Sequence, residues 1–184
     1  MKFVLAIIVV VAFLIIGVAF FAWSGRYNVA ATVPHWDVTA WFLGEVRDRS
    51  IAFHSKKTQP PPLKDSKLIK MGFREYHAMC RLCHGAPGYE QAEFARGLYP
   101  KPPDLVSKGM QQRGDAELYW VVKNGIKMAG MPAFGPTHKE DELWSIVGFL
   151  RRMPGMQAKE YEASVRETSQ RKAGKDNHRG SKKH

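Results

Sequence analysis

Two cysteines and a histidine lie close together in the sequence Cys80-Arg81-Leu82-Cys83-His84, and these are the only two cysteines of the chain. This C-x-x-C-H spacing lets two thiols bond to the vinyl groups of a haem while the imidazole ligates its iron. A thioredoxin-like redox pair would need a βαβ pattern around it, and a zinc site would need a second pair of ligands. The sequence shows neither, so it predicts one covalently attached haem c, bound by Cys80 and Cys83 with His84 on the iron.

A long apolar segment opens the chain and carries no charged residue from Phe3 to Trp23. At about 1.5 Å per residue, a helix of this length spans about 30 Å, the thickness of the hydrocarbon core of a bilayer. The apolar region of a cleaved signal peptide is usually shorter, about 7–15 residues, and no A-x-A cleavage site is evident here. We therefore predict a transmembrane anchor over residues 1–25, with a long signal peptide that is removed as the alternative.

Residues 26–55 predict an amphipathic helix next to the membrane. Pro34 suits a first helical turn, and apolar side chains recur at helical spacing from Trp36 to Phe53. Such a helix can lie on the membrane surface, dock on the rest of the chain or dock on a membrane partner. We expect exposed or capping roles for His35 and His54 rather than roles as extra ligands.

A proline-rich linker is predicted over residues 56–65, because Pro60 to Pro62 are consecutive prolines. Such a run favours extended polyproline II and makes a semi-rigid spacer. The alternative is a strap that packs on the domain that follows.

Two helices should frame a domain over residues 66–155. The first begins near Ser66, runs to about Cys80 and contains Gly72. A glycine inside a helix costs roughly 1 kcal/mol against alanine, so it usually has a packing reason, such as the close approach of another helix. The second carries an apolar face from Leu143 to Leu150 and ends before Pro154. Gly72 therefore predicts a close crossing of these two helices.

This domain resembles the class I cytochromes c, and the resemblance rests on four features in the right order. They are Gly72 and Tyr76 before the cysteines, the Cys80-to-His84 motif, Pro102-Pro103-Asp104-Leu105, and Gly130-Met131-Pro132-Ala133-Phe134. With the apolar N-terminus, the chain is similar to membrane-anchored bacterial monohaem cytochromes c. The resemblance implies an all-α fold around one covalently bound haem, behind an N-terminal transmembrane helix.

The resemblance also implies a role for each matching residue. Cys80 and Cys83 would carry thioether bonds, and His84 would be the proximal ligand of the iron. Pro103 would accept a hydrogen bond from His84 Nδ1, and Leu105 would pack on the haem. One departure is Pro102, which stands where the family has Gly, so the local turn and the carbonyl that meets His84 stay open.

The resemblance implies Met131 as the distal ligand of the iron. Met128 lies three residues earlier, and spacing alone does not choose between the two. The Met131-Pro132 step matches the family's loop, in which proline enforces a non-helical path. An unliganded iron is the remaining alternative.

The chain carries a formal net charge of +11, which attracts acidic partners. The candidates for steering such a partner are Lys101, Lys108, Arg113, Lys123 and Lys127. In c-type cytochromes the haem is attached outside the cytoplasmic membrane, so the resemblance places the haem domain in the periplasm and excludes nucleic acid as a partner. The basic tail, residues 156–184, predicts disorder, with attraction to anionic lipid as a further role.

These expectations converge on an electron carrier tethered to the inner membrane, rather than an enzyme. It would pass electrons from a respiratory donor to a terminal oxidase or a periplasmic reductase, through docking surfaces that are acidic on the partners. The alternatives are a haem sensor or small peroxidase-like enzyme with an open distal site, and a haem subunit of a larger membrane oxidoreductase.

Overall fold

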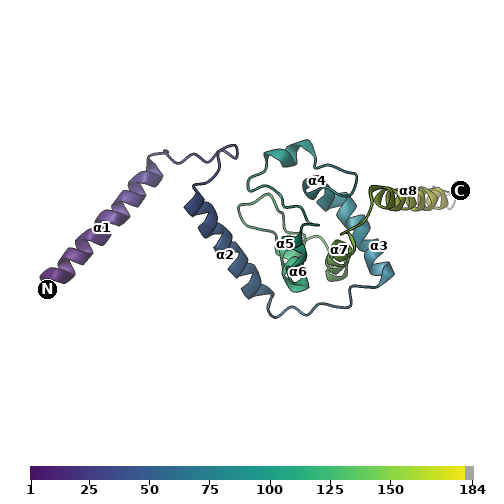
Figure 1. Ribbon diagram of the computed structural model, residues 1–184, viewed down its shortest axis with the longest axis horizontal. Coiled ribbons are helices and arrows are strands. Elements are labelled where there is room, and N and C mark those ends of the chain that lie inside the picture. Colours follow the sequence, from purple (N-terminus) through teal and green to yellow (C-terminus); the bar gives the residue numbers. More distant parts are fainter. Residues whose placement is uncertain (181–184) are drawn as a thin grey trace. The chain divides into compact units, whose positions relative to one another are not determined.

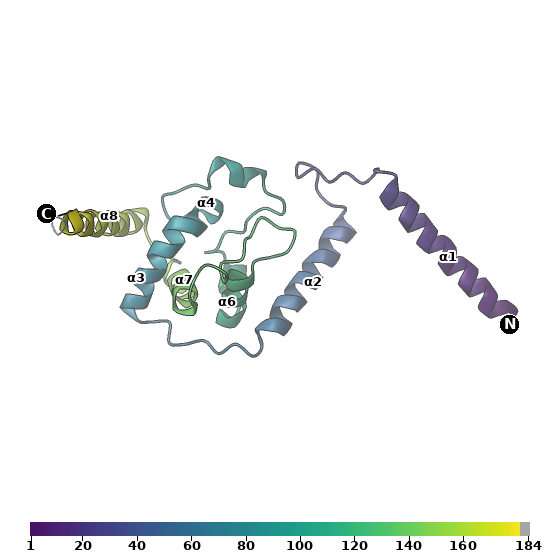
Figure 2. The same cartoon turned by 180° about the vertical axis from the view of Figure 1, so that it is seen from behind.

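The computed structural model describes residues 1–180, and the side chains of residues 1–170. Helices joined by turns make up this part of the chain, and no strand forms within it (Figures 1 and 2). The prediction of an all-α fold is confirmed. The chain divides into two units, Met1–His35 and a second that begins at Trp36.

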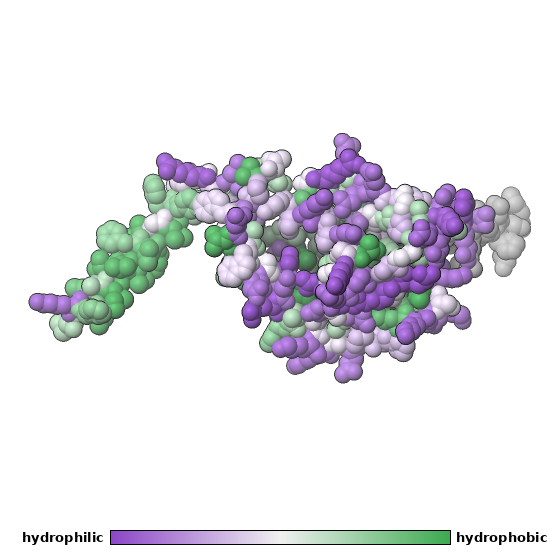
Figure 3. Space-filling view, in the orientation of Figure 1, coloured by the Kyte–Doolittle hydropathy of each residue, from purple (hydrophilic) through white to green (hydrophobic). Residues whose placement is uncertain are grey.

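The first unit consists of helix α1 (Lys2–Trp23) and the turns that follow it. This helix is long and apolar enough to cross a membrane, and hydrophobic residues cover it in Figure 3. After it, the Asn28 side chain accepts a hydrogen bond from the backbone N–H of Ala30. The Tyr27 hydroxyl lies 2.7 Å from Nδ1 of His35.

Helix α2 (Asp37–Ser55) begins later than predicted, because residues 24–36 form turns. It packs on α6 (Asp115–Asn124) on the side away from α3, as both cartoons show (Figures 1 and 2). Ile51 and Ser55 are each 3% exposed, and His54 stacks on Trp120 with 5.8 Å between ring centroids. Of the three alternatives for this helix, the structure therefore shows docking on the rest of the chain, through one face of the helix.

The proline-rich segment is extended, and one of its side chains packs on the domain. Leu63 contacts the hydrophobic core, and its carbonyl lies beside Gly148 of helix α7 (Glu140–Arg152). The segment is therefore a strap packed on the domain, which is the alternative to a free spacer.

Helices α3 and α7 cross at the centre of the domain. Helix α3 (Ser66–Glu75) begins after Asp65, whose side chain caps it by accepting the N–H of Lys67. A Cβ on Gly72 would overlap the Ser145 carbonyl, so the two backbones touch where the sequence predicts their crossing. The core around the crossing is almost fully buried and includes Phe73, Tyr76, Leu143, Ile146 and Phe149.

The chain leaves α3 through a wide π-helical turn, η1 (Tyr76–Cys80), and continues into α4 (Arg81–His84). A 3₁₀ turn, η2 (Glu93–Gly97), and the short helix α5 (Lys108–Gln111) connect α4 to α6. The Cys80-to-His84 motif thus lies at the end of a helix that α7 holds in place.

The prediction of a disordered tail over residues 156–184 is wrong as far as residue 180, because residues 158–180 form helix α8 (Ala158–Gly180). Tyr161 is fully buried and meets Phe73 edge-on, with 5.0 Å between ring centroids. Val165, one turn later, also packs against the core. Two apolar residues are too few to show a helical pattern in the sequence, yet Tyr161 and Val165 hold the start of α8 on the domain. The end of the predicted tail, residues 181–184, lies outside the described residues.

Candidate haem site

Both cysteines of the motif are free thiols at the end of the η1–α4 segment. Cys80 is 8% exposed and Cys83 is half-buried. Burial raises the pKa of the Cys80 thiol to about 12, so this group is protonated at neutral pH. A thiol of this kind is a poor metal ligand, since metals bind the thiolate.

His84 ends α4, and the turn beyond it fixes its ring. Nδ1 of His84 lies 2.9 Å from the carbonyl oxygen of Pro103. Because a carbonyl only accepts, Nδ1 must donate, and Nε2 keeps its lone pair for a metal. Burial lowers the pKa of His84, an effect that the bond to Pro103 partly opposes, so the ring is held in the neutral form that ligates iron.

The turn that carries Pro103 is held rigidly from its other side. The side chain of Asp104 accepts the N–H of Val106 at 3.0 Å, and the Ser107 hydroxyl donates to the Asp104 carbonyl at 2.7 Å. Gln111 donates to the carbonyl of Leu105 at 2.7 Å. Despite the proline at position 102, the carbonyl that meets His84 is therefore that of Pro103. Leu105 itself is half-buried against the core.

Arg151 supports this region from helix α7. Its only signal in the sequence is a basic residue in the last turn of a predicted helix. Its guanidinium donates to the Asp115 carboxylate at 2.7 Å and to the Gln111 carbonyl at 2.9 Å. It also donates to the carbonyl of Arg113. One side chain thus joins α5, α6 and the segment between them.

The two candidate methionines differ sharply in their surroundings. Met128 is 96% exposed and has a left-handed backbone with φ of 58°. Met131 is half-buried, and its carbonyl accepts the N–H of Ile126 at 3.1 Å. A Cβ on Gly125 would lie 2.7 Å from that same carbonyl. The loop is therefore closed around Met131 and leaves Met128 on its outside.

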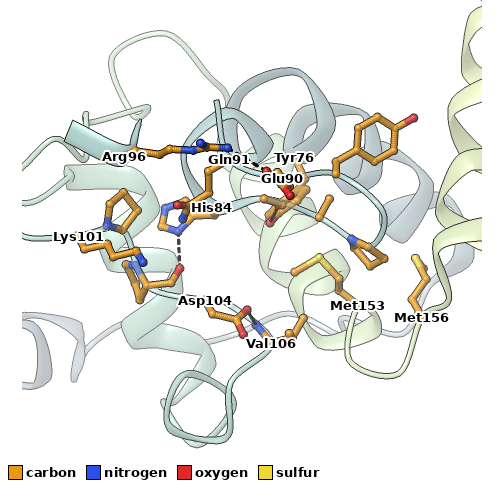
Figure 4. Close-up of a pocket in the computed structure, with 16 residues that line it drawn as sticks. Tyr76, His84, Glu90, Gln91, Arg96, Lys101, Asp104, Val106, Met153 and Met156 are labelled. Atoms are coloured by element: carbon orange, nitrogen blue, oxygen red, sulfur yellow. Dashed lines mark hydrogen bonds and ion pairs between the residues drawn. The ribbon is translucent and has the colours of Figure 1, made fainter. Parts of the chain in front are cut away.

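A cavity of about 1110 Å³ opens beside His84. Figure 4 shows His84 within it, with Arg96 and Gln91 on one side and Asp104 and Val106 on the other. Of the residues expected at the site, His84 and Pro103 line this cavity, whereas Cys80, Cys83, Leu105 and Met131 do not. It therefore lies next to His84 rather than between His84 and Met131.

Two further residues near the motif make contacts that sequence reasoning did not assign. The fully buried Tyr76 donates its hydroxyl to the carbonyl of Gly85 at 2.7 Å, which fixes the backbone just after His84. The Arg81 guanidinium lies 5.0 Å from the centre of the Tyr89 ring, and its Nε is buried without a hydrogen-bond partner among the described residues.

Together these donors fit a haem c. Cys80 and Cys83 are unpaired, the imidazole of His84 presents Nε2, and Met131 offers a half-buried thioether. Among the described residues, no cluster of three or more His, Cys, Asp or Glu side chains could hold a bare metal ion. Two thiols, an imidazole and a thioether are the groups that attach and ligate the haem of a c-type cytochrome.

Comparison with known proteins agrees with this chemistry. The family model described as cytochrome C oxidase, cbb3-type, subunit III matches residues 67–150, from α3 to the last turns of α7. No curated protein matches the chain. The matched segment holds the two thiols, His84, Pro103 and Met131. The chain thus carries a c-type cytochrome domain over residues 67–150, behind an N-terminal apolar helix, and this domain implies a haem cofactor and haem-based electron transfer.

Proposed function

We propose that this protein is a membrane-tethered electron carrier with one haem c, attached through Cys80 and Cys83 and ligated by His84 and Met131. When bound, the haem supplies an iron that cycles between Fe(III) and Fe(II). Helix α1 anchors the chain in the inner membrane, and the haem domain faces the periplasm. Electrons come from a respiratory donor and leave to a terminal oxidase or a periplasmic reductase.

The observation that carries this proposal is the hydrogen bond between His84 Nδ1 and the Pro103 carbonyl. It fixes the tautomer and the orientation of a ring that directly follows two free thiols. Such contacts raise the basicity of a ligating histidine. A ring oriented in this way supports a role as a permanent axial ligand.

Met131 supports the closed, six-coordinate site of a carrier rather than an open site. Its thioether comes from a loop tied to α6, since Phe134 and Gly135 donate backbone hydrogen bonds to the carbonyls of Val122 and Lys123. Ligation by His and Met raises the reduction potential of a haem, which suits a late position in an electron-transfer chain.

The basic surface available to an acidic partner is smaller than the sequence suggests. Arg113 pairs with Asp48 and Lys123 with Glu140, each at 2.7 Å. Lys101, Lys108 and Lys127 are exposed and make none of the ion pairs found among the described residues. We therefore assign the steering of acidic partners to these three lysines, through a field that salt weakens.

Ferric haem with a methionine ligand shows a weak charge-transfer band in the near infrared, and this band tests the distal ligand. We expect the band in the full-length protein, its loss in Met131→Ala and its retention in Met128→Ala. Met128→Ala is the matched control, since it removes the same side chain from the same loop. A high-spin ferric spectrum of the wild-type protein, or loss of the band only in Met128→Ala, would contradict the proposed ligation of the iron by Met131.

The second candidate function is the haem subunit of a larger membrane oxidoreductase, and the name of the matching family favours it. In that case the protein should co-purify with other membrane subunits after mild detergent extraction, in fixed stoichiometry. An open-site sensor or peroxidase has less support. His138 is engaged with Thr137, at 2.8 Å, and with the carbonyl of Phe134, at 3.3 Å.

A further inference from the structure

The side of α2 that points away from α6 is apolar and exposed. At about 100° per residue, positions 38, 42, 46 and 53 fall on one side of the helix, opposite Ile51 and Ser55. Their exposed fractions are 66% for Val38, 57% for Phe42, 48% for Val46 and 66% for Phe53. We call these four side chains the outer face of α2.

A helix that is apolar on two opposite sides normally has a partner on both. The inner side of α2 has one, because it packs on α6 through Ile51 and the ion pair of Asp48 with Arg113. The exposed fractions show that the described part of the second unit leaves the outer face largely uncovered, and both cartoons place α2 at the edge of this unit (Figures 1 and 2). A patch of this kind on a soluble surface marks a site of interaction.

We propose that the outer face of α2 lies in the lipid–water interface of the membrane that α1 spans. Phe42, Val46 and Phe53 would enter the boundary between headgroups and acyl chains. The haem domain, which packs on the inner side of α2, would then have a fixed orientation to the membrane instead of swinging on a tether. This inference rests on α1 remaining as an anchor and not on the identity of the haem ligands.

The charges within the outer face favour lipid over a dry protein groove. Arg49 lies between Val38 and Phe42 around the helix, and its side chain is 80% exposed although it pairs with Glu45 at 2.6 Å. Burying this pair in a protein groove would cost its hydration. At an interface, the guanidinium stays among phosphate groups while its stem covers apolar surface.

The aromatic residues that flank the outer face also favour lipid as its partner. Trp36 and Trp41 are 61% and 68% exposed, at the N-terminal end of α2. Tryptophan is enriched at the interface of membranes, where its ring meets both apolar and polar groups. Lys56 lies 5.5 Å from the centre of the Phe53 ring at the other end of the helix, so a cation accompanies the apolar face there as well.

Chain connectivity keeps α2 within reach of the membrane surface. Residues 24–36 join the two helices, and a fully extended chain of this length spans no more than about 50 Å. The actual reach is shorter, because the bond between Tyr27 and His35 closes most of this segment into a loop. The length of this connection therefore allows the outer face of α2 to reach the surface of the membrane in which α1 lies.

Photo-crosslinking tests the proposal in the full-length, haem-loaded protein. Benzoylphenylalanine replaces Phe42 or, in a second variant, Phe53, and the protein is reconstituted into vesicles of phosphatidylcholine and phosphatidylglycerol. The matched control places the same group at Phe94 of η2, which is 58% exposed, almost the same as Phe42. After irradiation, mass spectrometry measures lipid adducts on the peptides that carry each position.

We expect lipid adducts at positions 42 and 53 to exceed those at position 94 several-fold. Equal labelling at all three positions, or adducts between two copies of the chain, would overturn the proposal. So would adducts at 42 and 53 to another protein when the experiment is repeated in native membranes. The haem spectrum of each sample shows that the variant is folded and reports on the proposed function separately.

Discussion

At the residue scale, the chemistry depends on which atoms His84 and Met131 present. The bond from His84 to Pro103 leaves only Nε2 of the ring for iron. Met131 is half-buried in its loop, whereas Met128 is almost fully exposed. Each of these two proposed ligands thus owes its position to backbone contacts that its own residue type does not reveal.

Gly125 is the residue on which the methionine loop depends most directly. Its backbone has φ of 66° and ψ of −169°, a region open essentially to glycine alone. We expect Gly125→Ala to destabilise the loop by about 1–3 kcal/mol through backbone strain alone. The new Cβ would also clash with the backbone of Met131 and Ala133, which adds to this cost. The near-infrared band of the ferric protein should weaken, and thermal unfolding should begin at lower temperature.

Gly97→Ala is the control for this change, because a Cβ there meets nothing within 4 Å. It should leave both the band and the unfolding temperature close to wild type. If Gly125→Ala retained the full band at wild-type stability, the loop would not hold Met131 in the way the structure indicates.

His77 makes the stability of the domain depend on pH. It lies 3.1 Å from the Tyr161 hydroxyl, stacks on Phe73 and faces Tyr89 and Arg81. Burial, with a smaller effect of Arg81, lowers its pKa below 6.5 in the folded state. The unfolded chain therefore binds the proton more readily, so stability is complete above pH 6.5 and is lost as the pH falls below it.

Urea unfolding of wild type and His77→Gln between pH 7.5 and pH 5 measures this effect as a difference between the two proteins. The free energy of unfolding should fall more steeply in the wild type as the pH decreases. Parallel curves for the two proteins would remove His77 as the cause. Carboxylates titrate in both proteins and cancel in the comparison.

At the element scale, the crossing of α3 and α7 holds the segment with the Cys80-to-His84 motif in place. Gly72→Ala should destabilise the domain by about 1–3 kcal/mol or more, as overpacking does, because the new Cβ would overlap the carbonyl of Ser145. Chemical unfolding of the purified protein measures the loss. Haem incorporation during expression should fall with it.

Gly44→Ala provides a contrast at the same scale. It also changes a glycine inside a helix, but a Cβ on Gly44 meets nothing within 4 Å. We expect it to stabilise by about 0.5–1 kcal/mol. Equal destabilisation by both substitutions would mean that contact between the two backbones is not the reason for glycine at position 72.

The elements also show which parts of the fold could be predicted from the sequence and which could not. Gly72, the thiols and the apolar face from Leu143 to Leu150 are local signals, and the structure places the corresponding helices where they predict. The hydrogen bonds of Arg151 join parts of the chain about 40 positions apart. The position of α8 depends on the packing of Tyr161 against Phe73 and Phe149. Such contacts follow from tertiary packing and leave no periodic pattern. Helix α2 was predicted, but neither its start nor its contact with α6 was.

At the scale of the whole molecule, the haem domain is larger than the segment that matches the cytochrome family. Helix α2 packs on α6 ahead of that segment, and α8 packs on α3 and α7 behind it. The ion pairs of Lys70 with Glu167 and of Arg152 with Glu160 also fix α8, although both are exposed and each contributes little. The packing of Tyr161 should therefore dominate.

We expect Tyr161→Ala to destabilise the protein by about 3–5 kcal/mol, the usual cost of removing a buried aromatic ring. Tyr161→Phe keeps the ring and loses only the contact with His77, so its cost should be about 1 kcal/mol. Thermal unfolding of the two variants separates packing from hydrogen bonding. A Tyr161→Ala protein as stable as wild type would mean that α8 is not part of the folded domain.

The central claim is that both axial positions of the haem are filled, as a carrier requires. Carbon monoxide tests this most directly, since it binds ferrous haem at a vacant or weakly held position. The full-length ferrous protein in membranes should show no spectral change under carbon monoxide, whereas Met131→Ala should form the adduct. Ready formation of the adduct by the wild-type protein would contradict the account and favour an open-site sensor or enzyme.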